Sequence, residues 1–198
     1  MIPVPGDVIE ALRLHLQVAC PRAQRGWESV KEEEDAITGD FFGNLRTDWT
    51  ATGKYSWRFS YNKFRGRGRG ALEKEIGADG LITVQYLDPE EGKTYYKSLV
   101  FQAKKQNGRI KPSQLETMRR HFPGGSAVVI YGPSGYTAYE HTPLGMMRLC
   151  DMIAFNFLNC TIGTEGLHYD SRLGQMILPN APALSGGIER LLIEIKKD

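Results

Sequence analysis

Alternating apolar and polar positions predict two adjacent β-strands near the middle of the chain. The first strand is expected at 81–87 and the second at 95–101, with Pro89 and Gly92 in the turn between them. Two strands joined by so short a turn pair as an antiparallel hairpin. In such a hairpin the start of the first strand lies opposite the end of the second, so residues on either side of the hairpin meet at one end.

Three polar side chains are expected at this open end of the predicted hairpin. The turn lies midway between Asp79 and Ala103, so Asp79 is expected beside Gln102 and Lys104. Gln102 and Lys104 are two residues apart, and alternate residues of a strand point to the same face. An acid, an amide oxygen and an ammonium group should therefore converge there.

These side chains have the chemistry of a metal site that hydrolyses phosphodiesters. Asp79 offers a hard oxygen ligand to Mg²⁺, and Gln102 offers a neutral carbonyl oxygen. Lys104 would position or help deprotonate the attacking water, or offset charge that develops on the phosphate. The alternative is that Asp79 caps a turn and Lys104 is a solvated charge, because an Asp followed at variable distance by Gln-x-Lys is common by chance.

A helix is predicted from about Trp27 to Leu45, and an acidic run lies on it. Glu34 is the preferred further metal ligand, because apolar residues follow it at intervals of three, seven and eleven positions and place it on the core-facing edge of the helix. Asp35 is the second choice. An acidic run is most often a solvated face, and which acid would complete the site stays open among Glu32, Glu33, Glu34, Asp35 and Glu75.

Basic residues near the hairpin are candidate contacts to nucleic-acid phosphates. The segment 65–70 alternates Arg and Gly, so we expect an exposed loop in which Arg65, Arg67 and Arg69 contact phosphates. A loop that only aids solubility is the alternative. Further candidates follow the hairpin and lie on or before a predicted helix at 114–121, namely Lys105, Lys111, Arg119 and Arg120.

The remaining segments predict one α/β (α+β) domain. No internal repeat or composition shift divides residues 1–198, so a core at about 28–140 and a C-terminal helical extension at about 141–198 are expected to belong together. The other expected elements are a helix from Asp7 to Pro21, strands at 55–64, 126–131, 136–139 and 176–178, an apolar helix at 144–158 and an amphipathic helix at 188–195.

Composition and charge bear on the expected partners and cellular location of the protein. The 198 residues carry a net charge of +2, so any attraction to nucleic acid must be local. The three cysteines, Cys20, Cys150 and Cys160, lack metal-type spacing and are expected to be buried reduced thiols in a cytoplasmic protein. The N-terminal residues lack the pattern of a signal peptide, and charges interrupt the longest apolar region, so no membrane span is expected.

The order of these elements resembles the PD-(D/E)xK nuclease superfamily, and most closely its Mrr-like members. The likeness covers about residues 28–140 and is carried by Glu34 on an early helix, Asp79 at the start of one hairpin strand and Gln102-Ala103-Lys104 at the end of the next. The segment 34–43 is also similar to nuclease modules of bacterial antiphage systems. The resemblance implies a restriction-endonuclease-like core with a central mixed sheet and flanking helices.

The same resemblance implies Mg²⁺-dependent cleavage of DNA, with Mn²⁺ as a substitute metal. Asp79 and Gln102 would hold the metal together with Glu34, and Lys104 would lie beside the attacking water. Gln102 stands where most members carry Glu, as in the Mrr variant, which removes one negative charge. Metal binding would then depend more on Glu34, or the site would be degenerate.

Three functions are compatible with these observations. The first is a DNA endonuclease, an effector of antiphage defence by resemblance. The second is a non-catalytic nucleic-acid-binding module on a nuclease fold. The third is a subunit of a larger complex, whose C-terminal half docks a partner protein, and a homodimer fits a double-strand cut. Sequence preference, the choice between single strands, double strands and RNA, and any activator stay open.

Overall fold

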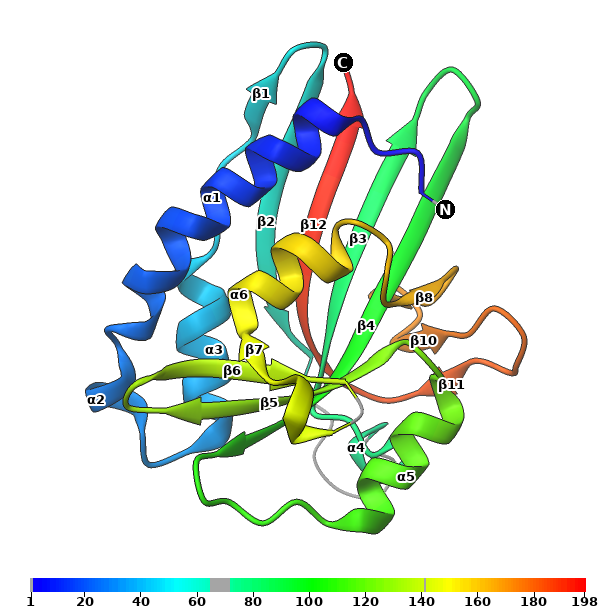
Figure 1. Ribbon diagram of the computed structural model, residues 1–198. Helices are drawn as coiled ribbons and strands as arrows, with labels where there is room; N and C mark the ends of the chain where they lie inside the picture. The colour runs from blue at the N-terminus through cyan, green and yellow to red at the C-terminus, as the bar shows by residue number, and fades with distance from the viewer. Residues whose placement is uncertain (1, 65–71, 141) are drawn as a thin grey trace.

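The computed structural model describes residues 2–64, 72–140 and 142–198 and shows an α+β fold built on one large mixed sheet (Figure 1). Within these ranges the large sheet has nine strands. Eight of them are hydrogen-bonded in the order β1 (Thr50–Thr52), β2 (Tyr55–Lys63), β12 (Glu189–Lys197), β3 (Gly80–Asp88), β4 (Lys93–Lys105), β5 (Ser126–Gly132), β6 (Gly135–Tyr139) and β7 (Met147–Arg148), while β8 (Thr164–Glu165) pairs with β4. A second, small sheet contains β9 (His168–Asp170), β10 (Gln175–Ile177) and β11 (Leu184–Ser185).

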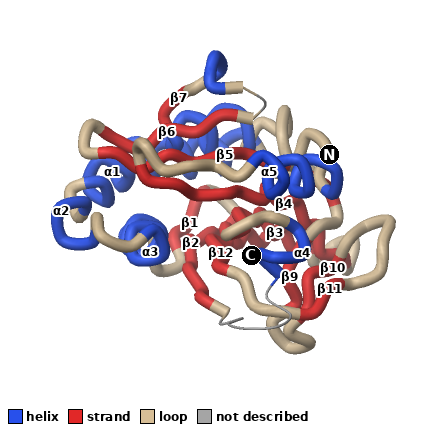
Figure 2. The backbone as a smooth tube through the Cα atoms, turned by 90° about the horizontal axis from the view of Figure 1, so that it is seen from below, coloured by secondary structure: helices blue, strands red, loops and turns tan. Residues whose placement is uncertain are grey.

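Helices lie on both sides of the large sheet (Figures 1 and 2). One face packs against α1 (Gly6–Gln24), α3 (Glu34–Asn44) and the π-helical turn η2 (Met152–Phe157). The other face packs against α4 (Leu72–Ile76), α5 (Pro112–His121) and the small sheet. Three short helical segments join these elements, namely α2 (Trp27–Val30), the 3₁₀ turn η1 (Pro143–Gly145) and α6 (Leu149–Asp151).

Side-chain alternation along the central strands builds the two cores. On β12 the buried residues Leu191 and Ile193 face α1 and α3, and on β4 the residues Leu99 and Phe101 do the same. The intervening residue Val100 enters the second core, under α5. Because neighbouring residues of a strand point to opposite faces, a strand between two cores is apolar at successive positions.

The long strand β4 connects two parts of a strongly bent sheet. In Figure 1, β5 and β6 run across the direction of β2, β12 and β3, and Figure 2 shows them as a separate layer. β4 pairs with β3 through residues 93–101 and with β5 through residues 100–105. The final residues of β4 therefore leave β3 and follow β5, at the point where the sheet opens.

Several predicted elements are confirmed. The aromatic strand, the central hairpin, the buried strand with its return strand, and the basic helix occur as β2, β3–β4, β5–β6 and α5. The short strand near Met176 is β10. The N-terminal helix continues through Pro21 to Gln24 instead of ending at the proline. Cys20 and Ala23 on this last turn are buried, and that packing maintains the helix beyond the proline.

The predicted C-terminal helix, and with it the helical extension, is wrong. The segment 189–197 is β12, which pairs antiparallel with β2 and parallel with β3 in the middle of the sheet. The apolar positions Ile188, Leu191, Leu192 and Ile195 have helical spacing, but a strand that is buried on both faces gives the same pattern. The β-branched Ile193, off the predicted apolar helix face, is fully buried and belongs to the strand.

Two other predicted helices are shorter than expected. The helix predicted from Trp27 to Leu45 is divided into α2 and α3, because Glu33 adopts an extended backbone with φ −124° and ψ 128°. Glu34 therefore begins a helix instead of lying within one. The apolar helix predicted at 144–158 is helical only in its second half, as α6 and η2, because the chain up to Arg148 forms a 3₁₀ turn and pairs with β6.

The prediction of three reduced thiols is also wrong. Cys20 on α1 and Cys150 on α6 form a disulfide, and Cys160 is the free cysteine among the described residues. The cysteines are far apart in the sequence, so only the packing of α1 against α6 brings the two sulfurs together. The disulfide removes the argument for a cytoplasmic location, which depended on reduced cysteines.

Reduction of this disulfide is expected to lower the free energy of unfolding by about 2–5 kcal/mol, because the bond closes a long loop. The bonded residues are separated by 130 positions in the chain. Denaturant unfolding of the parent with and without reductant measures the effect. Cys150→Ser should match the reduced parent and respond no further to reductant, whereas Cys160→Ser should retain the response. A parent that is unaffected by reductant would contradict this expectation.

Candidate active site

The β3–β4 hairpin places Asp79 level with Gln102, one residue from the position opposite Ala103 that the sequence predicted. Gly80 pairs with Phe101, and the Asp79 N–H donates to the Phe101 carbonyl over 2.9 Å. In an antiparallel pair, one step back along the first strand corresponds to one step forward along the second. The position before Gly80 therefore lies opposite the position after Phe101. β4 then continues to Lys105 with β5 as its paired neighbour. Beyond Phe101, β3 no longer pairs with β4, so side chains can reach the backbone groups on the edge of β4 that faces away from β5.

Two carboxylates bind the backbone amides on this open side of β4. The Ala103 N–H donates to Oδ2 of Asp79 over 2.7 Å, and the Lys105 N–H donates to Oε1 of Glu34 over 3.1 Å. Alternate N–H groups of a strand point to the same side and are about 6–7 Å apart. The two carboxylates therefore lie next to each other along the strand and replace hydrogen bonds that β3 does not supply.

Glu34 also forms an ion pair with Lys104. The Lys104 Nζ and the Glu34 Oε2 are 2.7 Å apart, and the two side chains are 17% and 31% exposed. Glu34 reaches β4 from the first turn of α3, where a carboxylate is favoured by the helix dipole. The structure therefore joins Glu34 to Lys104 at this end of the hairpin, where Asp79 and Gln102 lie level with each other on the paired strands.

The other acids that the sequence left open lie elsewhere. Asp35 points to a lysine of β2, with an N–O distance of 3.4 Å. The side chains of Glu32 and Glu33 are exposed, and so is that of Glu75 on α4. Among the acids considered, the structure favours Glu34 as the one whose carboxylate joins Asp79.

Gln102 contributes a buried amide whose oxygen has no protein partner. Its side chain is fully buried, and its Nε2 donates to Oε1 of Gln114 over 3.2 Å. The Gln102 Oε1 atom has no hydrogen-bond partner among the described residues. A buried acceptor left in this state costs about 1–3 kcal/mol. A ligand with a positive charge or a donor group would satisfy it.

The donor set fits a hard divalent cation. Mg²⁺ binds oxygen ligands, keeps several waters and is commonly held by one or two carboxylates. Asp79 and Glu34 supply carboxylates, and Gln102 supplies an amide oxygen. The described residues contain no group of three or more His, Cys, Asp or Glu side chains arranged to hold a metal. Any metal here would therefore depend on the amide oxygen and on water as well as the two carboxylates.

A glycine permits the close packing that supports this site. Gly77, just before β3, has φ +72°, and a Cβ atom there would lie 2.3 Å from the Gln114 carbonyl of α5. Only glycine adopts this backbone without strain and leaves space for the helix. The segment that carries Asp79 is thereby fixed against the same helix turn whose Gln114 side chain accepts from Gln102.

The predicted phosphate contacts are only partly available for binding. Lys111 is exposed at the start of α5, and Arg120 is exposed beside Glu116. The Lys105 Nζ donates to the Glu32 carbonyl, and Arg119 Nη2 donates to the Glu140 carbonyl over 3.0 Å, so Arg119 also supports the fold. Arg65, Arg67 and Arg69 lie outside the described residues.

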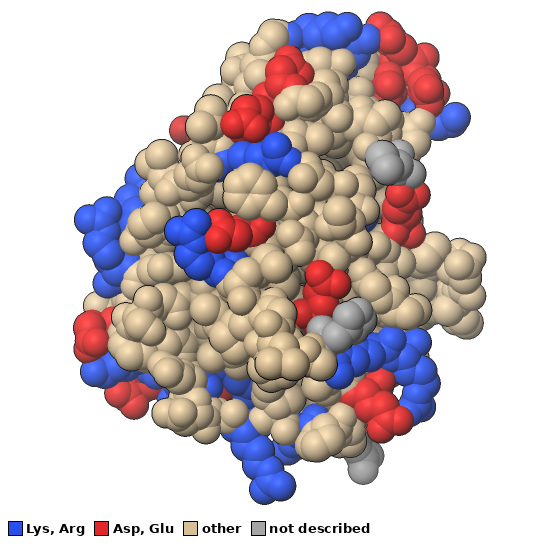
Figure 3. Space-filling model, in the orientation of Figure 1, with Lys and Arg blue, Asp and Glu red and all other residues tan. Residues whose placement is uncertain are grey.

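Basic side chains occur near the lower edge of the face in Figure 3, at the end of the molecule where α5 lies in Figure 1. Acidic side chains lie beside them. This surface is mixed in charge, so attraction to a polyanion would be local to the exposed lysines and arginines, as the near-zero net charge of the chain requires.

Two residues near the site could not be identified from the sequence. Gln114 fixes the Gln102 amide from a separate helix, and no spacing links the two. Tyr131, opposite Lys105 on β5, is fully buried, and its hydroxyl lies 3.0 Å from the Thr38 hydroxyl. Burial raises the Tyr131 pKa above its ordinary value, so this hydroxyl stays protonated and supports α3 against the sheet.

Comparisons with protein-family models, with curated proteins and with solved structures find no match to this chain. Among the described residues, no helix combines the length and the apolar character needed to cross a membrane. The arrangement of Glu34, Asp79, Gln102 and Lys104 is therefore the observation on which a function has to be based.

Proposed function

We propose that this protein is a metal-dependent endonuclease that hydrolyses DNA phosphodiesters. The convergence of Asp79, Gln102, Lys104 and Glu34 on the open end of β4 carries this proposal. An amide oxygen without a partner lies level with a carboxylate, and an ammonium group is held close by. The likeness to PD-(D/E)xK nucleases and to antiphage modules, stated above from sequence, supports the same reaction and an effector role in defence.

Each side chain has a distinct role in the proposed reaction. Asp79, the Gln102 Oε1 and Glu34 would hold Mg²⁺, which supplies Lewis acidity and lowers the pKa of bound water when present. Lys104 positions the attacking water or offsets charge on the phosphate in the transition state. Water loses a proton as its oxygen bonds to phosphorus, the bond from phosphorus to one ester oxygen breaks, and that leaving oxygen takes up a proton, so that one water is consumed for each bond cut. Glu34 keeps Lys104 in place through their ion pair.

A plasmid cleavage assay tests the proposed activity. The parent is expected to nick or linearise supercoiled DNA with Mg²⁺ or Mn²⁺ and to lose this activity in EDTA. Metal-binding calorimetry on the parent and on Asp79→Asn measures the site separately from cleavage. Asn retains an oxygen that accepts from the Ala103 N–H, so the backbone contact survives while the charge is lost. A parent that neither cuts DNA nor binds either metal would contradict the proposal.

A non-catalytic nucleic-acid-binding module is the second candidate, and one observation favours it. The site has two carboxylates and an amide where three acids would bind a metal more strongly. This candidate predicts DNA binding that weakens steeply with salt and no cleavage with either metal. Loss of affinity on replacing Arg65, Arg67 and Arg69 would support it, and binding that is insensitive to salt would count against it.

The C-terminal half stays a proposed docking surface, although the C-terminal helix that partly motivated it is β12 in the sheet. The segment that precedes β8 is the remaining support for a partner or a second copy. Leu144 is 98% exposed and Phe155 is 43% exposed, which gives the segment around η1 and η2 apolar side chains on the surface. Light scattering on the purified protein tests self-association.

A further inference from the structure

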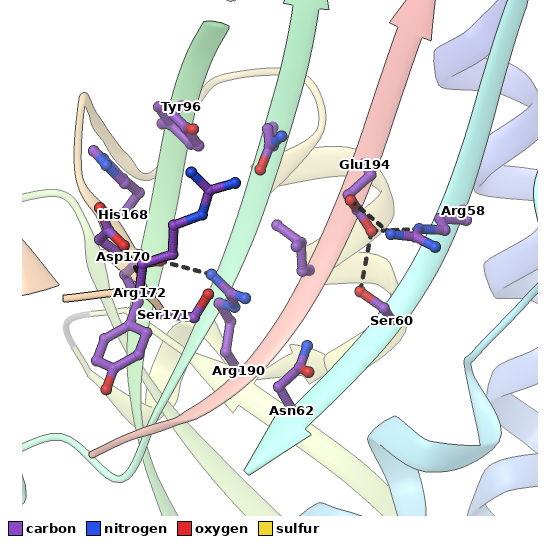
Figure 4. A pocket seen from close by; sticks show the side chains of 13 residues that line it. Arg58, Ser60, Asn62, Tyr96, His168, Asp170, Ser171, Arg172, Arg190 and Glu194 are labelled. Carbon is purple, nitrogen blue, oxygen red and sulfur yellow. Dashed lines mark hydrogen bonds and ion pairs between the residues drawn. The ribbon is translucent and has the colours of Figure 1, made fainter. Parts of the chain in front are cut away.

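A polar pocket lies on the face of the large sheet opposite α1, and its lining shares no residue with the candidate active site (Figure 4). Its volume is about 700 Å³, which falls within the range of small-molecule sites. β2, β12, β3 and β4 supply its floor, and β9 with the turn that follows supplies one wall. The pocket therefore draws on the β3–β4 hairpin and on three further strands from other parts of the chain.

The floor of this pocket is polar although its strands are central. On the face toward α1, β12 carries Leu191 and Ile193 in the core. On the opposite face, Arg190 pairs across to Asn62, and Glu194 pairs across to Arg58. Central strands that are covered on both faces are apolar throughout. The polar residues here indicate a face that meets water and polar ligands.

Arg190 is a buried cation without an acidic partner. Its side chain is 8% exposed, and its Nη1 donates to the Tyr169 carbonyl over 2.7 Å. Its Nε has no hydrogen-bond partner among the described residues, and no described carboxylate lies within 4.0 Å of its guanidinium. Burial lowers the pKa of Arg190 because the charged form loses hydration. A bound anion would compensate this charge.

The acids of the pocket are already neutralised or engaged. The Glu194 carboxylate accepts two hydrogen bonds from the Arg58 guanidinium, of 2.5 and 3.0 Å. The Asp170 carboxylate accepts from the Leu173 N–H over 3.2 Å and from the Arg172 N–H over 2.8 Å, and these contacts lower its pKa. Asp170 thereby fixes the turn that carries Arg172. Arg172 and Arg190 together leave the pocket with a positive charge.

A flat aromatic wall lies beside these guanidinium groups. The rings of Tyr96 and His168 stack with centroids 3.9 Å apart and an interplanar angle of 12°. The His168 Nδ1 lies 2.9 Å from the Gly166 carbonyl, which fixes the ring. In Figure 4, Arg172 and Arg190 lie between this stacked pair and Asn62. A ligand with an anionic group and a planar ring would meet complementary surfaces.

We propose that this pocket binds a small phosphate-bearing ligand of nucleotide size. The phosphate binds to Arg172 and Arg190, and the planar ring packs against an outer face of the Tyr96–His168 stack. Arginine suits this role because its planar fork binds phosphate through paired hydrogen bonds. Arg190 is largely buried, so a terminal phosphate can reach it. An internal phosphate of a polymer carries chain on both sides, and that chain would have to enter the pocket with it.

Calorimetry and thermal unfolding with AMP, inorganic phosphate and adenosine test the proposal. AMP is expected to bind and to raise the melting temperature of the parent, whereas adenosine, which lacks the phosphate, does neither. Arg172→Gln, at an exposed position, should weaken AMP binding by about 10- to 100-fold, the loss expected for a hydrogen bond to a charged group. Arg190→Met should weaken it similarly. Arg148→Gln, an exposed arginine outside the pocket, is the matched control and should bind as the parent does.

Two outcomes would overturn the proposal. One is the absence of AMP and phosphate binding at millimolar concentration, or binding that Arg172→Gln and Arg190→Met leave unchanged. The other is binding of a single-stranded oligonucleotide, but not of AMP, that both substitutions abolish, because the pocket would then be part of a nucleic-acid groove. These measurements need no cleavage activity, so their result is independent of the proposed nuclease function.

Discussion

Lys104→Met is expected to lower the rate of metal-dependent DNA cleavage by about 10²- to 10³-fold, the loss seen when one group that stabilises transition-state charge is removed. Lys104 and Glu34 are partly exposed, and exposed ion pairs contribute about 0–1 kcal/mol to stability. The folded protein should therefore persist while the activity is lost. Single-turnover cleavage of plasmid DNA, with a thermal unfolding curve for each variant, measures both quantities.

Lys93→Met is the matched control for this experiment. Lys93 lies on the same strand as Lys104, at the opposite end of the hairpin, and is exposed. The substitution removes the same charge and introduces the same side chain without touching the site, so cleavage should stay close to the parent rate. Equal rates for Lys104→Met and Lys93→Met would show that Lys104 has no part in the reaction.

Ile193→Ala is expected to lower the free energy of unfolding by about 2–5 kcal/mol, the range for deleting a large aliphatic side chain from a core. Ile193 is fully buried and lies between Phe59 and Val84 on the neighbouring strands. Its removal leaves a cavity at the centre of the sheet. Equilibrium denaturation in urea, followed by fluorescence and circular dichroism, measures the change.

Lys196→Ala on the same strand provides the comparison. Its ammonium group lies over the Trp49 ring at 4.8 Å, a surface contact worth less than about 1 kcal/mol. A large effect at Ile193 and a small one at Lys196 match a buried central strand. A small effect at Ile193 would instead match the amphipathic helix expected from the sequence, because Ile193 lies off the apolar face of that helix.

Whether the sequence could place a site residue depends on how far apart in the chain that residue and its contacts lie. Asp79 and Gln102 meet because a short turn between alternating strands sets the hairpin register, and both features are readable in the sequence. Glu34 meets Lys104 across 70 residues, and the sequence offered several acids for that position. The break at Glu33, which starts α3 at the right place, could not be seen in the apolar spacing.

The sequence by itself determined the central hairpin, to within one residue of its register, the basic helix α5 and the aromatic strand β2, because these depend on residues close together in the chain. The tertiary structure decided the rest. It inserted β12 between β2 and β3, joined Cys20 to Cys150, and brought Arg172 beside Arg190. Apolar runs that fit a helix or a buried strand equally well are resolved only by the neighbours that bury them, and those neighbours lie far away in the sequence.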